Sequence, residues 1–490
     1  MNGNEGMTTN TAGDGGTGER RARAAAFRDA HATAREGWRR RYGFYHDEDI
    51  RALRYLVPAG RSILAVGCGD GHVLANLEPS RGLGLDSAAT MVHLARERHP
   101  SMEFRHVDIE AADVFAGLNE TFDIVLLADS IGWIDDIESV LARLSAVCHP
   151  DTRVVISYHA PMWEPALRIA ERLRLKAPMP PLNWLGMADL SALLDLAGFE
   201  VIRREWRTLL PFRLFGLGSL VNRLVAPLPV VRQLCLRNYL VARARGAAEP
   251  APRSASVIIP ARNEKGNIEA AVARLPQFCD RVEIVFVEGH SKDGTLDEMH
   301  RVKAAYPDRE IKILVQDGKG KGDAVRKGFA AATGEVLMIL DADLTVPPED
   351  MPKFFRQIAE GRGEFVNGTR LVYPMEDEAM RTLNRIANYG FSVIFTWLLN
   401  QRFTDTLCGT KVLRKRHYEA IAANRLYFGD FDPFGDFDLI FGAIKLNLKV
   451  VEVPIRYLAR TYGETQISRF RHGWLLLQMV AFAWRKLKAY

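Results

Sequence analysis

Residues 335–343 read EVLMILDAD, a run of five apolar residues that leads into a pair of aspartates. Such a run is typical of a buried parallel strand, whose last side chains reach the carboxyl edge of an open α/β sheet. Sheets of this kind bind ligands at that edge. Two carboxylates at positions i and i+2 suit a hard divalent cation that is shared with a diphosphate. We therefore expect Asp341 and Asp343 to bind a metal ion.

Length and composition bound the kind of protein. The chain has 490 residues, which predicts two or three domains, and its hydrophobic fraction of 48% is sufficient for their cores. Its formal net charge of +5 fits anionic small ligands or a membrane surface better than a dedicated nucleic-acid binder. The five cysteines are scattered and never stand at metal-ligand spacing, which predicts a reduced, cytoplasmic compartment and no zinc site.

The order of patterns along the chain predicts two doubly wound α/β domains. Residues 1–22 are expected to form a disordered tail rather than a signal peptide, because they lack a hydrophobic core. A linker rich in Ala and Pro, 246–254, separates a first domain, 23–245, from a second, 255–490. In both, strand patterns alternate with helical ones, which predicts parallel sheets with helices on both faces. The expected strands are 62–66, 82–85, 123–127 and 153–157 in the first domain, and 256–259, 282–287, 311–315 and 335–340 in the second.

The first domain contains a glycine-rich loop after its first strand and acids at the ends of two later strands. Gly67, Gly69 and Gly71 let the backbone turn tightly and let a ligand approach the next helix. Asp86 ends the second strand, where a carboxylate can accept both hydroxyls of a ribose, and Asp108 lies at the end of the third. This order of loop and acids predicts a nucleoside-binding site.

This half resembles the class I S-adenosylmethionine-dependent methyltransferases over about residues 45–245. The resemblance implies a Rossmann-like fold, S-adenosylmethionine as cofactor and the three glycines around its methionine part. It also implies Asp86 on the ribose and Asp108 near the adenine. Ala65 departs from the family's pattern, which usually has an acid two positions before the first glycine.

The catalytic side of the first domain is less defined. The strand that ends at Leu127 is followed by Ala128-Asp129-Ser130 and not by the Asn-Pro-Pro-Tyr pattern of amino-group methyltransferases. Methyl transfer mostly needs alignment and in some cases a base, for which His159 and Asp129 are candidates; a structural role is the alternative for either. The methyl acceptor is unknown, and a non-catalytic binding module is the alternative for the whole domain.

Polar residues also follow the strands of the second domain. The sequence Pro260-Ala261-Arg262-Asn263-Glu264 follows the first of these strands with groups that can read a base edge, and Glu288 ends the next. The loop Gly318-Lys319-Gly320-Lys321-Gly322 precedes a helix, so its amides and lysines can hold a phosphate. A flexible basic loop is the alternative for that segment.

Together with Asp293-Gly294-Thr295, Gly368-Thr369-Arg370 and the segment from Asp405 to Lys411, these motifs resemble family 2 glycosyltransferases of the GT-A fold. The resemblance covers about residues 255–470 and is greatest for the polyprenyl-phosphate (dolichyl-phosphate) mannosyl- and glucosyltransferases. It implies a nucleotide sugar as donor, a polyprenyl phosphate as acceptor and Mg²⁺ or Mn²⁺ as the metal. The residues implied are Pro260, Ala261, Asn263, Glu264 and Glu288 at the nucleoside, Lys321 at a phosphate, Asp341 and Asp343 at the metal, Arg370 and Arg381 at the acceptor phosphate, and Arg460 closing over the donor.

Three positions depart from the family's pattern. Gly289 stands where a second acid often occurs, Thr345 replaces a glutamine that can contact the metal in the mannosyl enzymes, and Gln466 replaces a lysine of the closing loop. These departures bear on whether the sugar is mannose, more than on glycosyl transfer itself.

The class of acceptor decides whether a base is needed. A phosphate monoester, with a second pKa near ~6, is already ionised at neutral pH, whereas a sugar hydroxyl requires a base. Asp438, with Asp436 before it, is the candidate for that base. Arginines around residue 380 favour the phosphate, because Arg binds phosphate bidentately.

We expect a bifunctional cytoplasmic enzyme, a methyltransferase joined to an inverting, metal-dependent glycosyltransferase that acts on a polyprenyl phosphate. No segment has the ~18 uninterrupted apolar residues that span a bilayer, so the lipid must be met at the inner face of the membrane. Residues 474–488 are a candidate for an amphipathic interfacial helix, with packing on the domain's own core as the alternative. The alternative for the glycosyltransferase is a saccharide acceptor.

Overall fold

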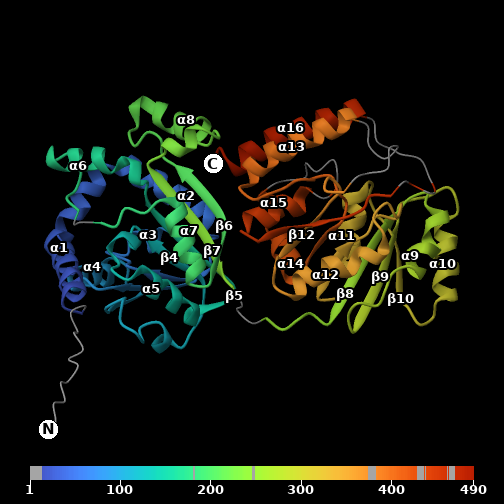
Figure 1. Cartoon of the computed structure of the whole chain (residues 1–490), viewed down its shortest axis with the longest axis horizontal. Helices are drawn as coiled ribbons and strands as arrows, with labels where there is room; N and C mark the ends of the chain where they lie inside the picture. The colour runs from blue at the N-terminus through green and yellow to red at the C-terminus, as the bar shows by residue number, and fades with distance from the viewer. Residues whose placement is uncertain are drawn as a thin grey trace, which may run out of the picture. The chain divides into compact units, whose positions relative to one another are not determined.

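The structure is a computed structural model that describes residues 14–179, 182–245, 249–373, 382–427, 435, 437–458, 460, 462 and 469–490. The chain divides into two compact units, unit 1 (Met1–Ala247) and unit 2 (Ala248–Tyr490). Figure 1 shows both, with unit 1 coloured from blue to green and unit 2 from yellow-green to red.

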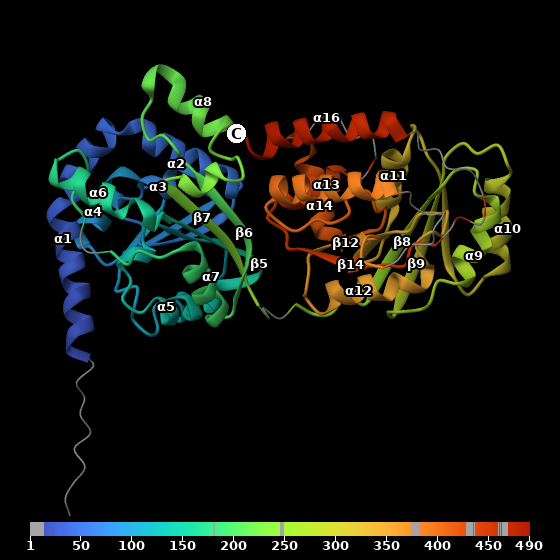
Figure 2. The ribbon, with the colours of Figure 1, turned by 45° about the horizontal axis from the view of Figure 1, so that its top comes forward.

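Unit 1 is built on a seven-stranded sheet with the order β3-β2-β1-β4-β5-β7-β6. Its strands are β1 (Ser62–Val66), β2 (Arg81–Asp86), β3 (Glu103–His106), β4 (Phe122–Ala128), β5 (Cys148–His159), β6 (Phe199–Arg207) and β7 (Arg237–Ala244). Its helices are α1 (Asp14–Arg41), α2 (Gly43–Leu56), α3 (His72–Asn76), α4 (Ala89–Arg98), α5 (Ile137–Arg143), α6 (Glu164–Arg172), α7 (Met187–Leu196) and α8 (Leu217–Leu224). The strands from β3 to β5 are parallel, and β7 is antiparallel to both β5 and β6. Figure 2 shows α5 and α7 together on one side of this sheet.

Unit 2 has a second seven-stranded sheet, with the order β10-β9-β8-β11-β13-β12-β14. Its strands are β8 (Ser254–Ala261), β9 (Arg281–Glu288), β10 (Glu310–Val315), β11 (Val336–Ile339), β12 (Phe365–Thr369), β13 (Lys411–Arg414) and β14 (Val450–Pro454). Its helices are α9 (Ile268–Ala273), α10 (Thr295–Ala305), α11 (Lys321–Ala331), α12 (Met351–Ala359), α13 (Thr382–Leu399), α14 (Lys415–Ala423), α15 (Phe437–Lys445) and α16 (Arg469–Leu487). The strands from β10 to β11 are parallel, and β13 is antiparallel to both of its neighbours.

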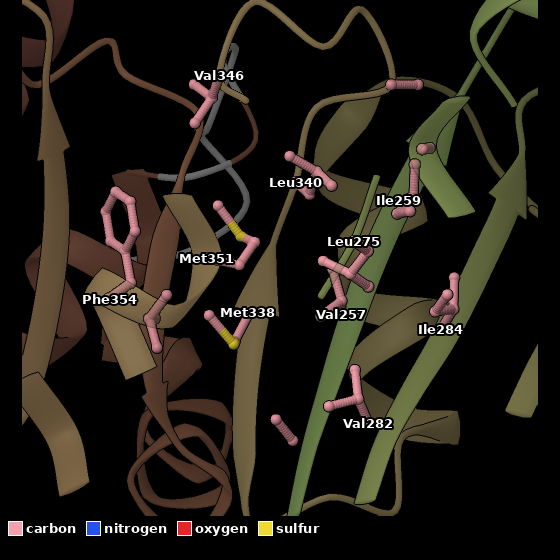
Figure 3. Close-up of a cluster of buried hydrophobic side chains, with 14 of the residues drawn as sticks. Val257, Ile259, Leu275, Val282, Ile284, Met338, Leu340, Val346, Met351 and Phe354 are labelled. Atoms are coloured by element: carbon pink, nitrogen blue, oxygen red, sulfur yellow. The ribbon is translucent and has the colours of Figure 1, made fainter. Parts of the chain in front are cut away.

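The core of unit 2 forms around β11, the strand expected from the opening sequence. All four residues of β11 are buried, and Met338 lies in one apolar cluster with Val257 of β8 and Ile284 of β9. Figure 3 shows these side chains together with Phe354, which α12 contributes from one face of the sheet. Burial of a large apolar side chain is worth roughly 1.5–3 kcal/mol, so this cluster fixes the strand that carries the two aspartates.

All eight expected strands are present, but the two sheets are mixed rather than wholly parallel. The antiparallel pairings come from β6, β7 and β13, which the sequence patterns did not identify. In β6, for example, Arg203 and Arg207 are buried charged residues, and both pair with Glu205, at 3.0 and 2.9 Å. A buried ion-pair network of this kind hides the apolar alternation by which a strand is recognised.

Helices α13 and α16 lie side by side above the sheet of unit 2 (Figures 1 and 2). The rings of Trp397 and Trp484 are 5.1 Å apart. Met479 and Leu487 of α16 are buried, whereas Trp474 is exposed, so the segment expected at 474–488 is packed on one face and open on another. Among the residues that the structure describes, no helix combines the length and the apolar character that crossing a bilayer requires.

Candidate functional site

Three adjacent parallel strands of unit 2 end at one edge of the sheet and bring together most of the residues expected at the nucleotide sugar. Pro260 and Ala261 are the last residues of β8, and Ala261 lies in register with Glu288, the last residue of β9. On the other side of β8, β11 ends at Ile339, two residues before Asp341. The carboxyl ends of parallel strands therefore place these groups side by side.

Hydrogen bonds between the loops after β8 and β9 hold the nucleoside candidates in place. Asn263 has a left-handed backbone (φ 57°), its N–H donates to Ser291 Oγ at 2.9 Å, and its Oδ1 accepts from the Lys292 amide at 2.9 Å. Glu288 accepts from the Ser291 amide. Glu264 is also buried, and burial raises the pKa of its carboxyl group above the ordinary value. These carboxylates are thus built into the loop framework.

Asp341 pairs with the lysine of the glycine-rich loop. Lys321, the first residue of α11, lies with its Nζ 2.6 Å from Asp341 Oδ1. Burial opposes ionisation of Asp341, but the charge and hydrogen bond of Lys321 outweigh it and lower the pKa of the carboxyl group. The other oxygen, Oδ2, faces Gly409, where an added Cβ would overlap it and would lie 2.5 Å from Lys321 Nζ. The segment before β13 therefore packs directly against Asp341, and the lack of a side chain at Gly409 permits this contact.

Asp343 is held by a hydroxyl on one side and by a guanidinium on the other. Thr345 Oγ1 donates to Asp343 Oδ1 at 2.8 Å. Arg460 lies 2.6 Å from Asp343 Oδ2 and 3.6 Å from Glu264 Oε1, so it bridges the ends of β8 and β11. Two residues on, the Tyr462 hydroxyl donates to Asp293 Oδ2 at 3.4 Å. Arg460 is thus placed over the edge of the sheet, where the resemblance implies that it closes over the donor.

Arg370 lies in a buried ion pair. It donates to both oxygens of Asp405, at 2.6 and 2.8 Å, and its guanidinium lies 5.1 Å from the centre of the Tyr457 ring. Burial opposes ionisation of Asp405, but Arg370 keeps the pKa of its carboxyl group below the ordinary value. The guanidinium expected at the acceptor phosphate is therefore already engaged in two hydrogen bonds. Arg381, its expected companion, lies outside the described residues, as does Gln466.

Asp438, the candidate base, is in the first turn of α15. Its Oδ2 lies 3.4 Å from Nε of Arg425, and its side chain is only 11% exposed. Gly435, three residues earlier, packs against Gly322 of α11. This brings the start of α15 to the helix end that carries Lys321. Asp436 is outside the part of the chain that the structure describes.

The residues at the edge of this sheet fit a divalent cation. Asp341 and Asp343 supply hard carboxylate oxygens from one strand end, which are the ligands that Mg²⁺ and Mn²⁺ prefer. Each carboxylate faces a cationic side chain, Lys321 or Arg460, so positive charge is already stabilised at both positions. A Cβ at Gly409 would overlap Asp341 Oδ2, so the absence of a side chain at position 409 lets the carboxylate keep this position.

Unit 1 carries the glycine-rich loop at the corresponding edge of its own sheet. Gly67, Gly69 and Gly71 all have positive φ angles, between 55° and 76°, and a Cβ on Gly67 would lie 2.5 Å from Cβ of Ser130. Asp86, at the end of β2, accepts from the Gly69 amide at 2.8 Å and is fully buried. The loop and the acid expected at the ribose are therefore in direct contact.

Arginines of α1 pair with the acids of this site. Arg28 donates to Asp86 Oδ1 at 2.9 Å, and Arg21 lies 3.8 Å from Asp108 Oδ2. Arg39 pairs with Asp70, whose carboxyl pKa it and its neighbouring arginines lower against the effect of burial. Arg28 therefore already occupies Oδ1 of the carboxylate that the resemblance implies at a ribose.

A cavity of about 350 Å³ opens beside the loop, and two of the residues that line it, Asp129 and His159, contact the buried Arg237. Arg237 is fully buried, pairs with Asp129, and lies 3.0 Å from Asp49 Oδ1 and 3.4 Å from His159 Nδ1. Burial, with the charge of Arg237 adding to it, lowers the pKa of His159 to about 3. His159 Nε2 lies 2.9 Å from the hydroxyl of Tyr45. The imidazole is neutral at physiological pH, and it is a weak base.

The loop and the cavity fit an adenosine-containing cofactor, since Gly67 and Gly71 have the positive φ angles of a tight turn and the ribose candidate Asp86 is part of the same loop framework. Ala65, at the position of the missing acid, is buried and also lines the cavity. Asp70 and Asp129 also line the cavity, so a cationic group of a bound ligand would meet carboxylates there.

Comparison with known proteins assigns a family to each unit. The "Glycosyl transferase family 2" model matches residues 256–422, and a "Methyltransferase domain" model matches residues 38–204. A dolichol-phosphate mannosyltransferase of Saccharomyces cerevisiae is 37% identical over an alignment of 233 residues, which covers 44% of this chain and 80% of the yeast protein. The chain belongs to the family 2 glycosyl transferases. A methyltransferase domain precedes its glycosyl transferase domain.

Further similarities cover parts of other proteins. A dolichol-phosphate mannosyltransferase of Pyrococcus furiosus is 31% identical over 44% of this chain, which spans only 59% of that relative's length. Among solved structures, a methyltransferase of Thermotoga maritima matches 44% of the chain and 96% of its own, with 17% identity and a TM-score of 0.35. Glucosyl-3-phosphoglycerate synthase of Mycobacterium tuberculosis matches 48% and 78%, with 16% identity and a TM-score of 0.36.

Three residues of this two-domain glycosyl transferase were not found by sequence reasoning. Gly409 lies within the motif from Asp405 to Lys411, but its role is identified only because it packs against Asp341. Arg237 begins a strand that was not expected, and its partners Asp49 and Asp129 are distant in the chain. Arg28 had a detectable signal, because the arginines at 21, 28 and 35 repeat every seven residues and so share one face of a helix.

Adding a side chain at position 409 tests whether Asp341 binds a metal ion. We expect Gly409→Ala to weaken Mn²⁺ binding at least about tenfold, because the added methyl group displaces Asp341 Oδ2. Free Mn²⁺ is counted by electron paramagnetic resonance in a titration of the whole chain. The matched control is Gly390→Ala, where an added Cβ meets open space. Unchanged affinity in Gly409→Ala would show that Asp341 is not a ligand.

The buried imidazole predicts a pH dependence of stability. The pKa of His159 is about 3 in the folded protein against 6.5 when unfolded, so the unfolded chain takes up a proton that the folded chain does not. Stability is therefore fully present above pH 6.5 and falls as the pH drops below it, by about 1 kcal/mol between pH 7 and pH 5.5. We expect His159→Gln to abolish this loss of stability between pH 7 and pH 5.5. Hydrogen exchange in urea, followed on peptides of β4 and β5, measures the stability of unit 1 at each pH. The control is His93→Gln, at an exposed histidine, which should keep the wild-type dependence of stability on pH.

The ion pair at the ribose candidate predicts opposite effects of two substitutions on S-adenosylmethionine affinity. Asp86→Ala should weaken binding more than about tenfold through loss of the ribose acceptor. Arg28→Ala should tighten it several-fold, because binding no longer has to break an ion pair. Isothermal calorimetry measures both, with Arg23→Ala, an exposed arginine of the same helix, as the control. Weaker binding in Arg28→Ala would mean that this arginine holds the cofactor.

Proposed function

We propose that unit 2 transfers a sugar from a nucleotide sugar to a polyprenyl phosphate with inversion, and that unit 1 is an S-adenosylmethionine-dependent methyltransferase. The observation that carries the first part is the convergence of Asp341, Asp343, Lys321 and Arg460 at the ends of β8 and β11. The identity with dolichol-phosphate mannosyltransferases supports this class of acceptor.

The residues of this site perform three tasks in the proposed reaction. Pro260, Ala261, Asn263, Glu264 and Glu288 form the wall that receives the nucleoside. Asp341 and Asp343 would hold Mg²⁺ or Mn²⁺, which supplies positive charge for the diphosphate leaving group. Lys321 and Arg460 add fixed positive charge on either side, and such preorganised charge stabilises a leaving oxygen most effectively where water is excluded.

The ionisation of a phosphate acceptor and the charge of Arg370 are the basis of the proposal for the acceptor. A phosphate monoester is largely ionised at neutral pH, its second pKa being near ~6, so it attacks without a base. Asp405 fixes the Arg370 guanidinium by two hydrogen bonds. The remaining N–H groups of Arg370 can donate to an anion. Arg381 is proposed as its companion. Asp438 would serve as the base only for a hydroxyl acceptor.

The membrane is proposed as the place of the reaction, because a polyprenyl chain does not leave it. In unit 2, the exposed apolar residues Trp474 and Leu477 of α16 and Tyr389 and Val393 of α13 are candidates to contact its surface. The five cysteines are free, which agrees with the reduced, cytoplasmic side of the membrane.

In unit 1, the proposed role of the chain is to align the two reactants. Gly67, Gly69 and Gly71 would border the methionine part, with Asp86 at the ribose and Asp108 near the adenine. The cofactor supplies the activated methyl group, and the neutral imidazole of His159 and the Asp129 carboxylate face the cavity as acceptors of a proton or a hydrogen bond.

The test of the glycosyl transfer is an incubation of the whole chain with Mn²⁺, polyprenyl phosphate and a panel of labelled nucleotide sugars. We expect label in the organic extract with one donor and a loss of at least about 100-fold in Asp343→Asn, which corresponds to about 2.7 kcal/mol in the barrier. Asp308→Asn, an exposed carboxylate of the same unit, is the control. Asp438→Asn should cost little.

Two outcomes would contradict the proposed acceptor. Donor hydrolysis without lipid label would exclude a lipid phosphate. Near-total loss in Asp438→Asn, with label in a saccharide added to the same mixture, would identify a hydroxyl acceptor that needs a base.

A further inference from the structure

The segment between β6 and β7 of unit 1, residues 209–234, exposes an apolar surface. Figures 1 and 2 show it projecting from one end of the unit around α8. Large apolar side chains of an ordinary protein surface are scattered singly, whereas here they are contiguous in one short segment. The exposed members include Phe212, Leu214, Phe215, Leu217, Leu220 and Leu224.

Helix α8 has Asn222 inside and its leucines outside. Asn222 is buried, accepts from the amides of Leu209 and Leu210 at 2.9 Å each, and donates to the Leu210 carbonyl oxygen at 2.9 Å. Leu217 and Leu220, on the opposite side, are 53% and 54% exposed. The hydrogen bonds of Asn222 therefore fix the helix with its apolar face toward the surroundings, which is the reverse of a helix that faces water.

The charge of this segment complements an anionic surface. Between Glu205 and Glu249 the sequence has no acidic residue. Arg213 and Arg223 are exposed, and no carboxylate pairs with either among the described residues. An apolar face with a basic rim is the pattern of segments that lie in the interface of membranes rich in acidic lipids.

The same surface continues into the cavity of unit 1. Pro211 and Phe212 line that cavity together with Gly67 and Asp129, so one wall belongs to the 209–234 segment and another to the proposed cofactor site. The Trp163 side chain, just before α6, donates to the Leu234 carbonyl oxygen at 3.0 Å. That contact ties the end of the segment to the neighbouring wall. A molecule anchored in lipid can therefore reach the cavity along an apolar path.

We propose that the 209–234 surface docks unit 1 on an anionic membrane, and that the methyl acceptor is an amphiphilic molecule drawn from that membrane. The second part rests on the proposed methyltransferase function. In the transfer, a lone pair of the acceptor's nucleophile bonds to the methyl carbon, and the bond from sulfur to that carbon breaks with its electron pair left on sulfur. The proton of the acceptor passes to water.

Docking is tested by hydrogen exchange of the whole chain with vesicles of phosphatidylcholine that contain about one-third phosphatidylglycerol. Peptides from 209–234 should become protected, and protection should be lost with phosphatidylcholine alone or at high salt. Because peptides of α16 are read separately, membrane contact by unit 2 does not obscure the result. Protection that is present without vesicles would mean that another part of the protein or a second copy covers the surface, and would overturn the proposal, as would no protection.

Charged substitutions provide the matched test. We expect Leu217→Asp with Leu220→Asp to reduce vesicle protection of this segment at least about tenfold. Both side chains are exposed, so the fold should persist, and the melting curve verifies this. The control is Leu196→Asp on α7, which is 69% exposed and lies outside the segment. Equal protection from hydrogen exchange by vesicles in the double variant and in the wild type would overturn the proposal that this surface docks on the membrane.

The class of acceptor is tested with S-adenosylmethionine carrying a labelled methyl group and a lipid extract in the same vesicles. Label in the organic phase that falls at least about tenfold in the double leucine variant supports a membrane acceptor. Label that appears only in water-soluble products would overturn it. Calorimetry with S-adenosylmethionine separates the two claims, because absence of binding would refute the methyltransferase proposal while leaving the docking result intact.

Discussion

The balance of charge around Asp341 is the constraint on which unit 2 depends. A carboxylate at the end of a buried strand is costly unless a cation meets it, and Lys321 does so at 2.6 Å from the first turn of α11. Arg460 performs the same task for Asp343 from near the end of the chain. Three segments that are far apart in sequence are thus joined by two ion pairs at one sheet edge. The apolar cluster around Met338 holds the strand that carries both acids.

Unit 1 follows the same physical logic with different residues. Its ribose candidate Asp86 is paired with Arg28, and Asp129 with the buried Arg237. At both proposed sites the charges are neutralised within the protein, so binding of an ionic ligand exchanges one ion pair for another. Such an exchange limits the net gain in free energy, and it makes affinity depend on the geometry of the incoming charge.

The features that could be predicted from sequence are those encoded locally. A strand such as Ser62–Val66 is a short apolar run with a turn directly after it, and Asp86 and Asp341 follow from their position at strand ends. The strand β6 was missed because its buried arginines and glutamate neutralise one another, which only the folded arrangement reveals.

Long-range contacts explain the other omissions. Gly409 is recognised only when the chain has brought it against Asp341. The roles proposed for the site residues remain predictions, and Arg381 lies outside the described residues. The seven-residue spacing of the arginines in α1 was visible in the sequence. The acids that they pair with, Asp86 and Asp108, could be assigned only from the folded structure.

The inverted orientation of α8 has a consequence for the protein in water. A contiguous apolar face that no described residue of unit 1 covers is a surface on which two copies can meet. Its cationic rim opposes that meeting most strongly at low ionic strength. Added salt screens this repulsion and strengthens apolar association. The tendency of the chain to aggregate should therefore rise with ionic strength, which is opposite to the salting-in expected of proteins that associate through charges of opposite sign.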